Sequence, residues 1–459
     1  MNRFLSIFFA ASLSLSVVPT GLAQSVDGKS GNAATVASTF ETPAFVNDVV
    51  NMKVPSFPDK QLVITKTGAK QGKLSTAAIQ KAIDRVAKQG GGSVVVPAGN
   101  WLSGRLMLKS NVNLHLEEGA TLEFTGEIND YLPLVDSRYE GADVKSLGAM
   151  IYANGVENIA VTGKGHLKAP SRDCEITGKM DTGLTVKAEK SIESGSAREA
   201  TLEKIYMPTF IGPINCRGVL IEDVTLDGSI FWNIAPVYCE NVIIRGVTVN
   251  SHGHPRTDGI DVDSSVNVLI EETTLDCGDD CFTLKAGRGE EAVELGRPTQ
   301  NVVIRNCRVK RGVGGITVGT ETAGFIRNIY AENVVMENPS RPLYFKTRRP
   351  RGGGAENVRI RNIRVVKTKG AAVQIDMLGN PAWMGELAER LPVRPVNNVT
   401  PKFADIVIDN FEVGECKALI QAKGLPEMPI EGFKMTNVKS ENKNIKLQDV
   451  GTIEITFSE

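Results

Sequence analysis

One phrase recurs along this sequence: GVLIEDVTL at residues 218–226, NVIIRGVTV at 241–249, NVLIEETTL at 267–275, NVVIRNCRV at 301–309, NIYAENVVM at 328–336 and NVRIRNIRV at 357–365. Each copy alternates β-branched apolar residues with polar residues, and most carry Asn, Gly or Asp near the middle. This pattern predicts short strands interrupted by a turn, without the spacing of an amphipathic helix. Weaker copies extend the repeat over most of the chain, at 111–124, 157–167, 405–413, 432–440 and 452–457.

The spacing of the copies, about 20 to 35 residues, is that of a solenoid in which each repeat stacks on the next. Doubly wound and barrel folds need a crossover helix after each strand, and no helical pattern separates these copies. A leucine-rich horseshoe is the structural alternative, but the copies lack its leucine frame and are rich in β-branched residues. The sequence therefore predicts an all-β fold, a single-stranded right-handed parallel β-helix.

Departures from the repeat indicate where the coil is capped or interrupted. Residues 75–88 carry apolar side chains at helical spacing after a serine, and three glycines follow at 90–92. We expect a short helix there that covers the open N-terminal end of the solenoid. Two longer interruptions, at 171–206 and 377–404, are predicted to be loops on one side of the coil, either as surface decoration or as walls of a binding groove.

Composition limits the partners and the compartment. The 459 residues carry 52 Lys and Arg against 53 Asp and Glu, so the clustered basic excess that nucleic acid requires is missing. Residues 1–23 have the pattern of a secretory signal peptide, with Arg3 before an apolar run and small residues at its end. An uncleaved anchor is the alternative. We expect residues 24–459 to form one exported domain without a membrane span, in the periplasm or outside the cell.

The seven cysteines cannot all pair with one another and are too sparse for a scaffold built on disulfides. We expect most of them to be buried thiols. Cys277 and Cys281 flank two aspartates, but a zinc site would need further Cys or His ligands, and the sequence has only four histidines. No metal and no other cofactor are predicted.

Three aspartates form the chemically distinctive part of the chain. Asp258 lies in RTDGIDVD at 256–263, and Asp279 and Asp280 lie in CGDDC at 277–281, about one turn of the solenoid later. Matching positions on adjacent turns stack at about 4.8 Å, so these carboxylates can converge. Their repulsion raises at least one pKa and supplies a protonated acid beside an ionised base, as glycoside hydrolysis requires. The alternative is that aspartates cap turn amides, which we expect for Asp261 and Asp263.

Several stretches resemble glycoside hydrolase family 28, the polygalacturonases and their relatives. They are VVVPAGNWLSGRLMLKSNVNLHLEEGATLEF at 94–124, SIFWNIAPVYCENVIIRGVTV at 229–249, TDGIDVDSS at 257–265 and GDDCFTLKAG at 278–287. The resemblance implies a family core at about 60–376, followed by further C-terminal turns at 405–459. It also implies that Asp279 is the general acid, that Asp258 and Asp280 activate a water on the opposite face, and that the reaction inverts the anomeric centre.

The sequence departs from the family pattern around these aspartates. The family's Asn before Thr-Asp is Arg256 here, and its Gly-His-Gly falls on residues 313–315, with Gly314 in place of the His. The family's Arg-Ile-Lys begins with Tyr344 and retains only Lys346. These losses concern contacts around the scissile bond and the substrate carboxylate, which puts simple polygalacturonan in doubt as the substrate.

Basic and aromatic residues near these positions are the candidates for substrate contacts. Lys346 can pair with a uronate carboxylate, and Arg349 follows in the Gly-rich stretch 347–354, as a groove residue or a solvated one. His252 lies just before the Asp258 turn and is a candidate replacement for the missing His. Arg256 and Tyr344 complete the predicted substrate-binding set.

With the resemblance, the sequence predicts an inverting glycoside hydrolase of uronate-containing pectic polysaccharide or oligosaccharide. We expect exo action on galacturonosyl linkages, because the two interruptions are long enough to close one end of a groove. A hydrolase of a rhamnogalacturonan region or side chain is one alternative. A pectate lyase that uses Ca²⁺ and a noncatalytic polysaccharide-binding β-helix are alternatives of other classes. The expected partner is the pectic substrate, and the expected state is a monomer.

Overall fold

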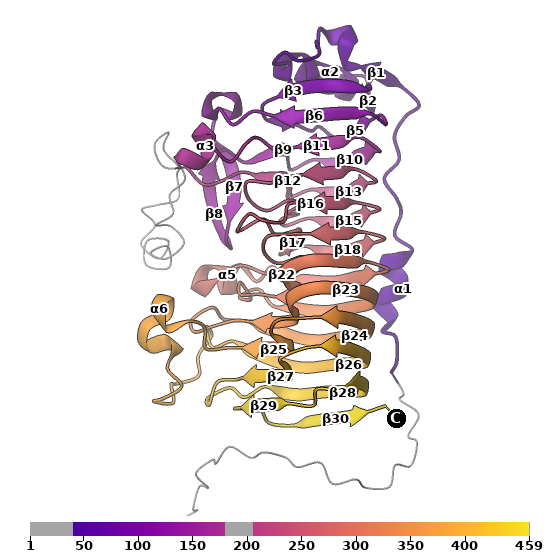
Figure 1. Cartoon of the computed structure of the whole chain (residues 1–459). Helices are drawn as coiled ribbons and strands as arrows, with labels where there is room; N and C mark the ends of the chain where they lie inside the picture. Colours follow the sequence, from indigo (N-terminus) through magenta and orange to yellow (C-terminus); the bar gives the residue numbers. More distant parts are fainter. Residues whose placement is uncertain (1–39, 180–204, 459) are drawn as a thin grey trace, which may run out of the picture. The chain divides into compact units, whose positions relative to one another are not determined.

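The repeated phrases form parallel strands that stack turn upon turn (Figure 1). The computed structural model describes residues 40–179 and 205–458. Its architecture confirms the predicted right-handed parallel β-helix. The predicted signal peptide and residues 180–204 of the first interruption lie outside the described residues.

The strands of successive turns form three parallel ladders. The first contains β1 (Gln61–Val63), β2 (Gly92–Val96), β5 (Val112–Leu116), β10 (Glu157–Gly163), β13 (Arg217–Glu222), β15 (Glu240–Arg245), β18 (Val266–Glu271), β21 (Thr299–Arg305), β23 (Ile326–Lys346), β24 (Gly354–Lys367), β26 (Lys402–Glu415), β28 (Glu431–Ser440) and β30 (Ile453–Phe457). The second contains β3 (Gly99–Ser103), β6 (Ala120–Phe124), β11 (His166–Lys168), β14 (Thr225–Asp227), β16 (Thr248–Asn250), β19 (Thr274–Asp276) and β22 (Arg308–Val318). The third contains β4 (Leu106–Met107), β9 (Ala149–Asn154), β12 (Thr209–Ile214), β17 (Ile260–Asp263), β20 (Phe282–Lys285), β25 (Ala371–Asp376), β27 (Ala418–Lys423) and β29 (Ile445–Gln448). The C-terminal parts of β22 and β23 connect β20 to β25 in this ladder, and isolated bridges at Ile234 connect β12 to β17.

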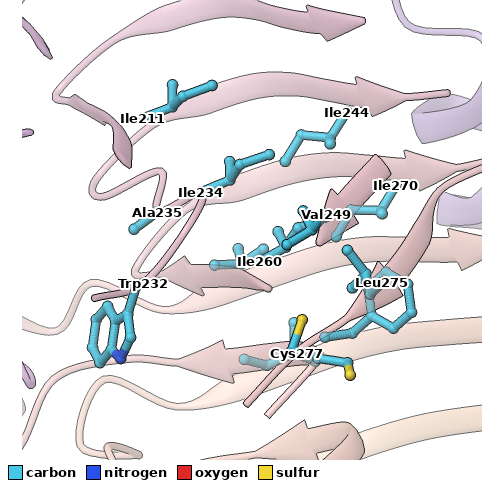
Figure 2. Packing of buried hydrophobic residues seen from close by; sticks show 14 of the residues in the cluster. Ile211, Trp232, Ile234, Ala235, Ile244, Val249, Ile260, Ile270, Leu275 and Cys277 are labelled. Atoms are coloured by element: carbon cyan, nitrogen blue, oxygen red, sulfur yellow. The ribbon is translucent and has the colours of Figure 1, made fainter. Parts of the chain in front are cut away.

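The core consists of apolar side chains stacked in register inside the coil. Val219, Val242, Val268 and Val302 are paired in sequence from β13 to β21, and all are buried. Figure 2 shows the same arrangement on the third ladder, where Ile211, Ile234 and Ile260 lie one above the other. The period-2 alternation of the phrase therefore places its β-branched residues on the inner face of each strand.

Stacked asparagines account for the Asn with which most copies of the phrase begin. Asn241, Asn267, Asn301 and Asn328 all have φ between 57° and 60°, the left-handed region that asparagine tolerates well. The side-chain amides of Asn267, Asn301 and Asn328 each donate to the side-chain oxygen of the asparagine one turn earlier, at 3.0, 2.9 and 2.8 Å. The stacked amides hold adjacent turns in one register.

An alternating charge ladder runs along the outer surface at the ends of the first-ladder strands. Glu222, Arg245, Glu271 and Arg305 occupy matching positions on successive turns. Arg245 contacts Glu222 at 2.6 Å, and Arg305 contacts Glu271 at 2.6 Å. Because Arg245 and Glu271 each lie between two opposite charges, the ladder supports the same register as the asparagines.

Helices cover the coil at two places. The predicted capping helix is present as α2 (Thr76–Lys88), which buries Ile79, Ile83 and Val86 at the end of the solenoid. The sequence did not reveal α1 (Ala44–Val50), which packs Val46 and Val49 on the outer face of the coil (Figure 1). Its contact surface is a stripe of outward-facing residues, Leu220, Ile243, Leu269, Val303 and Tyr330.

The remaining elements interrupt the ladders. They are η1 (Ile64–Thr67), η2 (Ile128–Tyr131), the antiparallel strands β7 (Val135–Tyr139) and β8 (Ala142–Ser146), α3 (Glu175–Gly178), α5 (Gly289–Leu295), α6 (Pro381–Met384) and η3 (Gly385–Ala388). All seven cysteines are free thiols, and most are buried, as expected. Among the described helices, none has the length and apolarity to cross a membrane.

We predict that Glu271→Gln lowers the free energy of unfolding by about 1–2 kcal/mol, because Arg245 and Arg305 then lose the charge that lies between them. The measurement is the midpoint of urea unfolding. The matched control is Glu412→Gln, whose carboxylate lies 3.9 Å from Arg364 on the exposed surface. That variant should stay within about 0.5 kcal/mol of the original protein, and equal losses in both variants would contradict the charge ladder.

Candidate active site

The structure brings the three predicted aspartates together. Asp258 lies just before β17, and Asp279 and Asp280 lie just before β20, which pairs with β17. One carboxylate oxygen from each residue lies within 4.8 Å of those of the other two. All three residues line a cavity of about 770 Å³ on the side of the coil.

Close approach of two turns fixes this convergence. The Thr257 hydroxyl donates to the carbonyls of Ser251 and His254 and accepts a hydrogen bond from the backbone N–H of Gly278, one turn later. At Gly278, a Cβ atom would lie 1.7 Å from the carbonyl oxygen of His254. Only glycine therefore lets the turn that carries Asp279 approach the turn that carries Asp258.

Backbone hydrogen bonds hold the aspartates from below and above. The N–H of Gly259 donates to the carbonyl of Asp280 at 2.8 Å, and the N–H of Val313 donates to that of Asp279 at 2.8 Å. Asn233 donates to the Asp258 carbonyl from both its backbone and its side chain. The carboxylates therefore project from fixed backbone.

Burial and mutual repulsion shift the ionisation of the group. Burial raises the pKa of Asp258, and the charges of Asp261 and Asp279 add to the effect. Burial is also the largest cause of the raised pKa of Asp279, followed by the charge of Asp280, while Lys346 and Lys285 act in the opposite direction. The site therefore favours a protonated carboxyl beside ionised ones.

Lys346 and Tyr344 lie in the cavity wall, on β23. The Lys346 ammonium donates to Asp280 Oδ2 at 2.6 Å and lies 4.9 Å from the centre of the Tyr344 ring. Arg341 lies over the same ring, at 5.0 Å. A partly buried ammonium at this position neutralises one aspartate and presents positive charge to the cavity.

Arg256 also lines the cavity, but it is held by a segment that is distant in sequence. Its guanidinium pairs with Glu140, in the turn between β7 and β8, and lies over the rings of Tyr139 and Phe231. The backbone of Arg256 adopts a φ of 63°. The β7–β8 hairpin therefore forms one wall of the site, which the sequence had not indicated.

Two predicted substrate contacts lie outside the cavity lining. A ring nitrogen of His252 lies 3.0 Å from the Cys277 carbonyl, on the far side of the turn. Arg349 is buried, pairs with Glu427 and donates to the carbonyls of Leu387 and Glu389. Arg349 therefore holds the 377–404 interruption against the coil, because its fork of donors is already used there.

The position of the missing histidine also needs correction. A Cβ atom on Gly314 would lie 1.9 Å from the Thr317 hydroxyl and 2.6 Å from Asp280 Oδ1, so no side chain fits there. The side chain that faces the cavity in this stretch is that of Val313. The cavity therefore has an apolar wall where the sequence comparison had placed only a glycine.

Comparison with known proteins identifies the family. The model of the glycosyl hydrolases family 28 matches residues 87–439. The chain belongs to this family. A probable polygalacturonase of Vitis vinifera is 27% identical over 374 residues, covering 80% of this chain and 70% of the relative. An exo-poly-alpha-D-galacturonosidase of Dickeya chrysanthemi is 28% identical, covering 74% and 62%. The solved structure of a hyperthermoactive exopolygalacturonase from Thermotoga maritima matches with a TM-score of 0.80 and 27% identity, covering 90% of this chain and 95% of that one.

As a family 28 member the protein is a glycosidase. Its cavity offers what that chemistry requires, namely clustered carboxylates with raised pKa values beside a cationic wall. The carboxylate oxygens are hard ligands that suit Ca²⁺, but the Lys346 ammonium already neutralises Asp280. The arrangement therefore fits proton transfer better than ligation of a cation.

The sequence analysis did not assign Asp261, Lys285 and Glu321 to the site, although all three are charged residues beside the catalytic aspartates. Asp261 and Asp263 were expected to cap turns, but both lie in β17, where Asp263 pairs with Arg138 at 2.8 Å. Lys285 and Glu321 line the family 28 cavity. The alternation of apolar and acidic residues along β17 could have revealed the position of these aspartates. Ile260 and Val262 point to the core, which leaves Asp261 and Asp263 on the outer face of the strand.

We predict that Asp279→Asn folds like the original protein, because it removes one charge from a group of mutually repelling carboxylates. Turnover should fall by about 10²- to 10⁴-fold if the carboxyl provides acid catalysis. The measurement is release of reducing sugar from pectic substrate, with circular dichroism as the test of folding. The matched control is Asp276→Asn, which removes a carboxylate paired with Arg311 on the neighbouring strand, outside the cavity lining. Near-normal activity of Asp279→Asn would exclude this residue from the mechanism.

Proposed function

We propose that this family 28 glycosidase hydrolyses galacturonosyl linkages of pectic polysaccharides or oligosaccharides by acid–base catalysis with inversion. Asp279 protonates the leaving oxygen, and Asp258 and Asp280 activate the attacking water. The observation that carries this proposal is the convergence of three carboxylates in one cavity: Asp258 and Asp280 are buried and Asp279 is partly buried, and the pKa values of Asp258 and Asp279 are raised.

The spacing of the carboxylates is compatible with a bound water. Two oxygens up to about 5.5 Å apart can share one water at ordinary hydrogen-bond lengths, and the nearest oxygens here lie within 4.8 Å. Carboxyl groups of inverting pairs are commonly about 6.5–9.5 Å apart, so inversion is supported by the family rather than by this nearest-oxygen spacing. The anomeric configuration of the first product, followed by NMR, decides between inversion and retention.

A uronate substrate is supported by the charge of the cavity wall. Lys346 lies beside the catalytic aspartates, and four arginines join it in the lining: Arg256, Arg341, Arg348 and Arg351. Cationic groups in a partly closed cavity favour an anionic sugar over a neutral one. The relatives named above are polygalacturonases, which points to the same class of substrate.

Exo action is supported by walls on both sides of the aspartates. The 377–404 interruption contributes Gly379, Asn380, Pro381 and Met384 to the lining, and the β7–β8 hairpin contributes Glu140. The described parts of the 171–206 interruption do not line the cavity. A closed end lets binding energy act on the terminal sugar of a chain.

The apolar part of the wall favours a second candidate, hydrolysis within a rhamnogalacturonan region. Tyr344 stands where the family pattern carries Arg, and Val313 precedes Gly314, the position of the family's His. A deoxy sugar next to galacturonate would match such a surface better than a second uronate. No specific observation favours a pectate lyase or a noncatalytic binder.

Export, domain organisation and a monomeric state complete the proposal. The pattern of residues 1–23 supports cleavage of a signal peptide and a location in the periplasm or outside the cell. Residues 24–459 would then act as one domain. Mass spectrometry of the exported protein and light scattering test cleavage and monomeric state directly.

We predict slow loss of viscosity in polygalacturonan solutions, with mono- or disaccharide products from the first minutes, because the walls of the partly closed cavity favour chain ends. Viscometry and mass spectrometry of the products follow the reaction. Glu140→Ala, which removes the partner of Arg256, should increase the share of longer products. A steep early drop in viscosity with mixed oligomers for the original protein would show an open groove.

We predict that Lys346→Ala lowers kcat/KM on uronate substrates more than on carboxyl-reduced ones, since a charge-assisted contact is worth about 1.5–3 kcal/mol. Because Lys346 also contacts Asp280, some loss should appear with both kinds of substrate. The matched control is Lys310→Ala, which lies outside the cavity lining. Equal losses on both substrates would assign Lys346 to support of Asp280 alone.

A further inference from the structure

Beside the catalytic aspartates lies a buried lysine that the proposed mechanism does not use. Lys285, at the end of β20, places its ammonium 3.1 Å from Glu321 Oε2 and 3.6 Å from Asp261 Oδ1. The ammonium also lies 4.6 Å from the centre of the Trp232 ring. A side chain that is 6% exposed and contacts two carboxylates is held in one position.

Asp261 is the less satisfied partner of this lysine. It is fully buried on β17, three residues after Asp258, and neither of its carboxylate oxygens accepts a hydrogen bond from a described residue. A buried carboxylate without such bonds depends on neighbouring cations for its ionisation. Lys285 is the cation in contact with it.

The charges around Asp258 come from several elements. The acidic ones are Asp261 on β17, Asp279 and Asp280 before β20, and Glu321 after β22; the basic ones are Lys285 on β20, Lys346 on β23, and Arg351 near Glu321 at 3.5 Å. Further charges nearby lie in pairs: Arg138 with Asp263, and Arg256 with Glu140. Arg288 acts on Glu321.

We propose that Lys285, held by Asp261 and Glu321, is a positioning residue that controls the ionisation of Asp258: Lys285 favours the carboxylate that a base requires, and Asp261 opposes it. This inference rests on the proposed role of Asp258 as part of the base. The cause is Coulombic, since the cation and the anion act on one buried carboxyl group from fixed positions.

The directions in which the pKa values of Asp258 and Lys285 are shifted agree with these roles. Besides burial, Asp261 raises the pKa of Asp258 and Lys285 lowers it. Although burial acts against the charged form, Glu321 and Asp261 raise the pKa of Lys285, so its ammonium persists throughout the working range of pH. Lys285 is therefore a constant charge beside two carboxyl groups that titrate, because burial raises the pKa of both Asp258 and Asp261 and Lys285 opposes that rise.

The test is the pH dependence of kcat/KM for Lys285→Met and Asp261→Asn. Loss of the cation favours protonated Asp258, so the acidic limb of the profile should move to higher pH in Lys285→Met. Loss of the like charge favours ionised Asp258, so the limb should move to lower pH in Asp261→Asn. The comparison is made at the pH where the original protein has half of its maximal kcat/KM. There, Lys285→Met should fall severalfold below half of its own optimum, and Asp261→Asn should rise toward its own optimum, a gain of at most about twofold.

Further variants separate this role from simple support of the fold. Lys285→Arg keeps the charge and should restore the limb, and the neutral double variant Lys285→Met/Asp261→Asn should bring it back toward the original position. A purely structural ion pair would lower thermal stability without moving the limb. An unmoved limb in both single variants, or movement in the same direction, would overturn the proposal. If Lys285→Met does not fold, Asp261→Asn decides the question alone.

A readout without turnover keeps this inference distinct from the proposed function. Infrared difference titration follows protonation of the buried carboxyl groups in the original protein and in both variants. Opposite displacements of that titration support the inference even if pectic substrates are not cleaved, and such failure of cleavage would refute only the proposed function. Identical titrations in all three proteins would refute the inference while leaving the proposed function intact.

Discussion

In-register stacking of successive turns is the constraint on which the rest of the structure depends. The asparagine amides from Asn241 to Asn328 and the charge ladder through Glu271 both define which residue lies above which. A slip of one residue would turn the valine stack outward and the polar positions inward. The same register places Asp258 one turn away from Asp279 and Asp280, so the site is a consequence of the repeat.

Stacking in register places several carboxylates close together on one face of the coil. Two lysines in the site reduce the repulsion between these carboxylates. Lys346 contacts Asp280, and Lys285 lies between Asp261 and Glu321. The remaining excess of negative charge, together with burial, raises the pKa values of Asp258 and Asp279. Repulsion that would otherwise weaken the fold therefore supplies the protonated acid that glycoside hydrolysis needs.

Segments outside the regular coil shape the cavity. The β7–β8 hairpin reaches it because Arg138 pairs with Asp263 and Glu140 pairs with Arg256. The 377–404 interruption reaches it because Arg349 holds that loop through Glu427 and two backbone carbonyls. These arginines link the cavity walls to the coil. The length of polysaccharide that the cavity can hold therefore depends on contacts between segments far apart in sequence.

The sequence by itself determined the coil, the capping helix and the three aspartates, because alternation, helical spacing and the interval of one turn are local properties of a repeat. Of the residues that it predicts as substrate contacts, Arg256, Tyr344 and Lys346 line the cavity. Only the tertiary structure decided that Arg349 supports a loop, that Val313 rather than Gly314 faces the cavity, and that Lys285 contacts Asp261. Those outcomes depend on which side chains meet across turns and interruptions, and the pairing of Arg138 with Asp263, 125 residues apart, has no local signature in the chain.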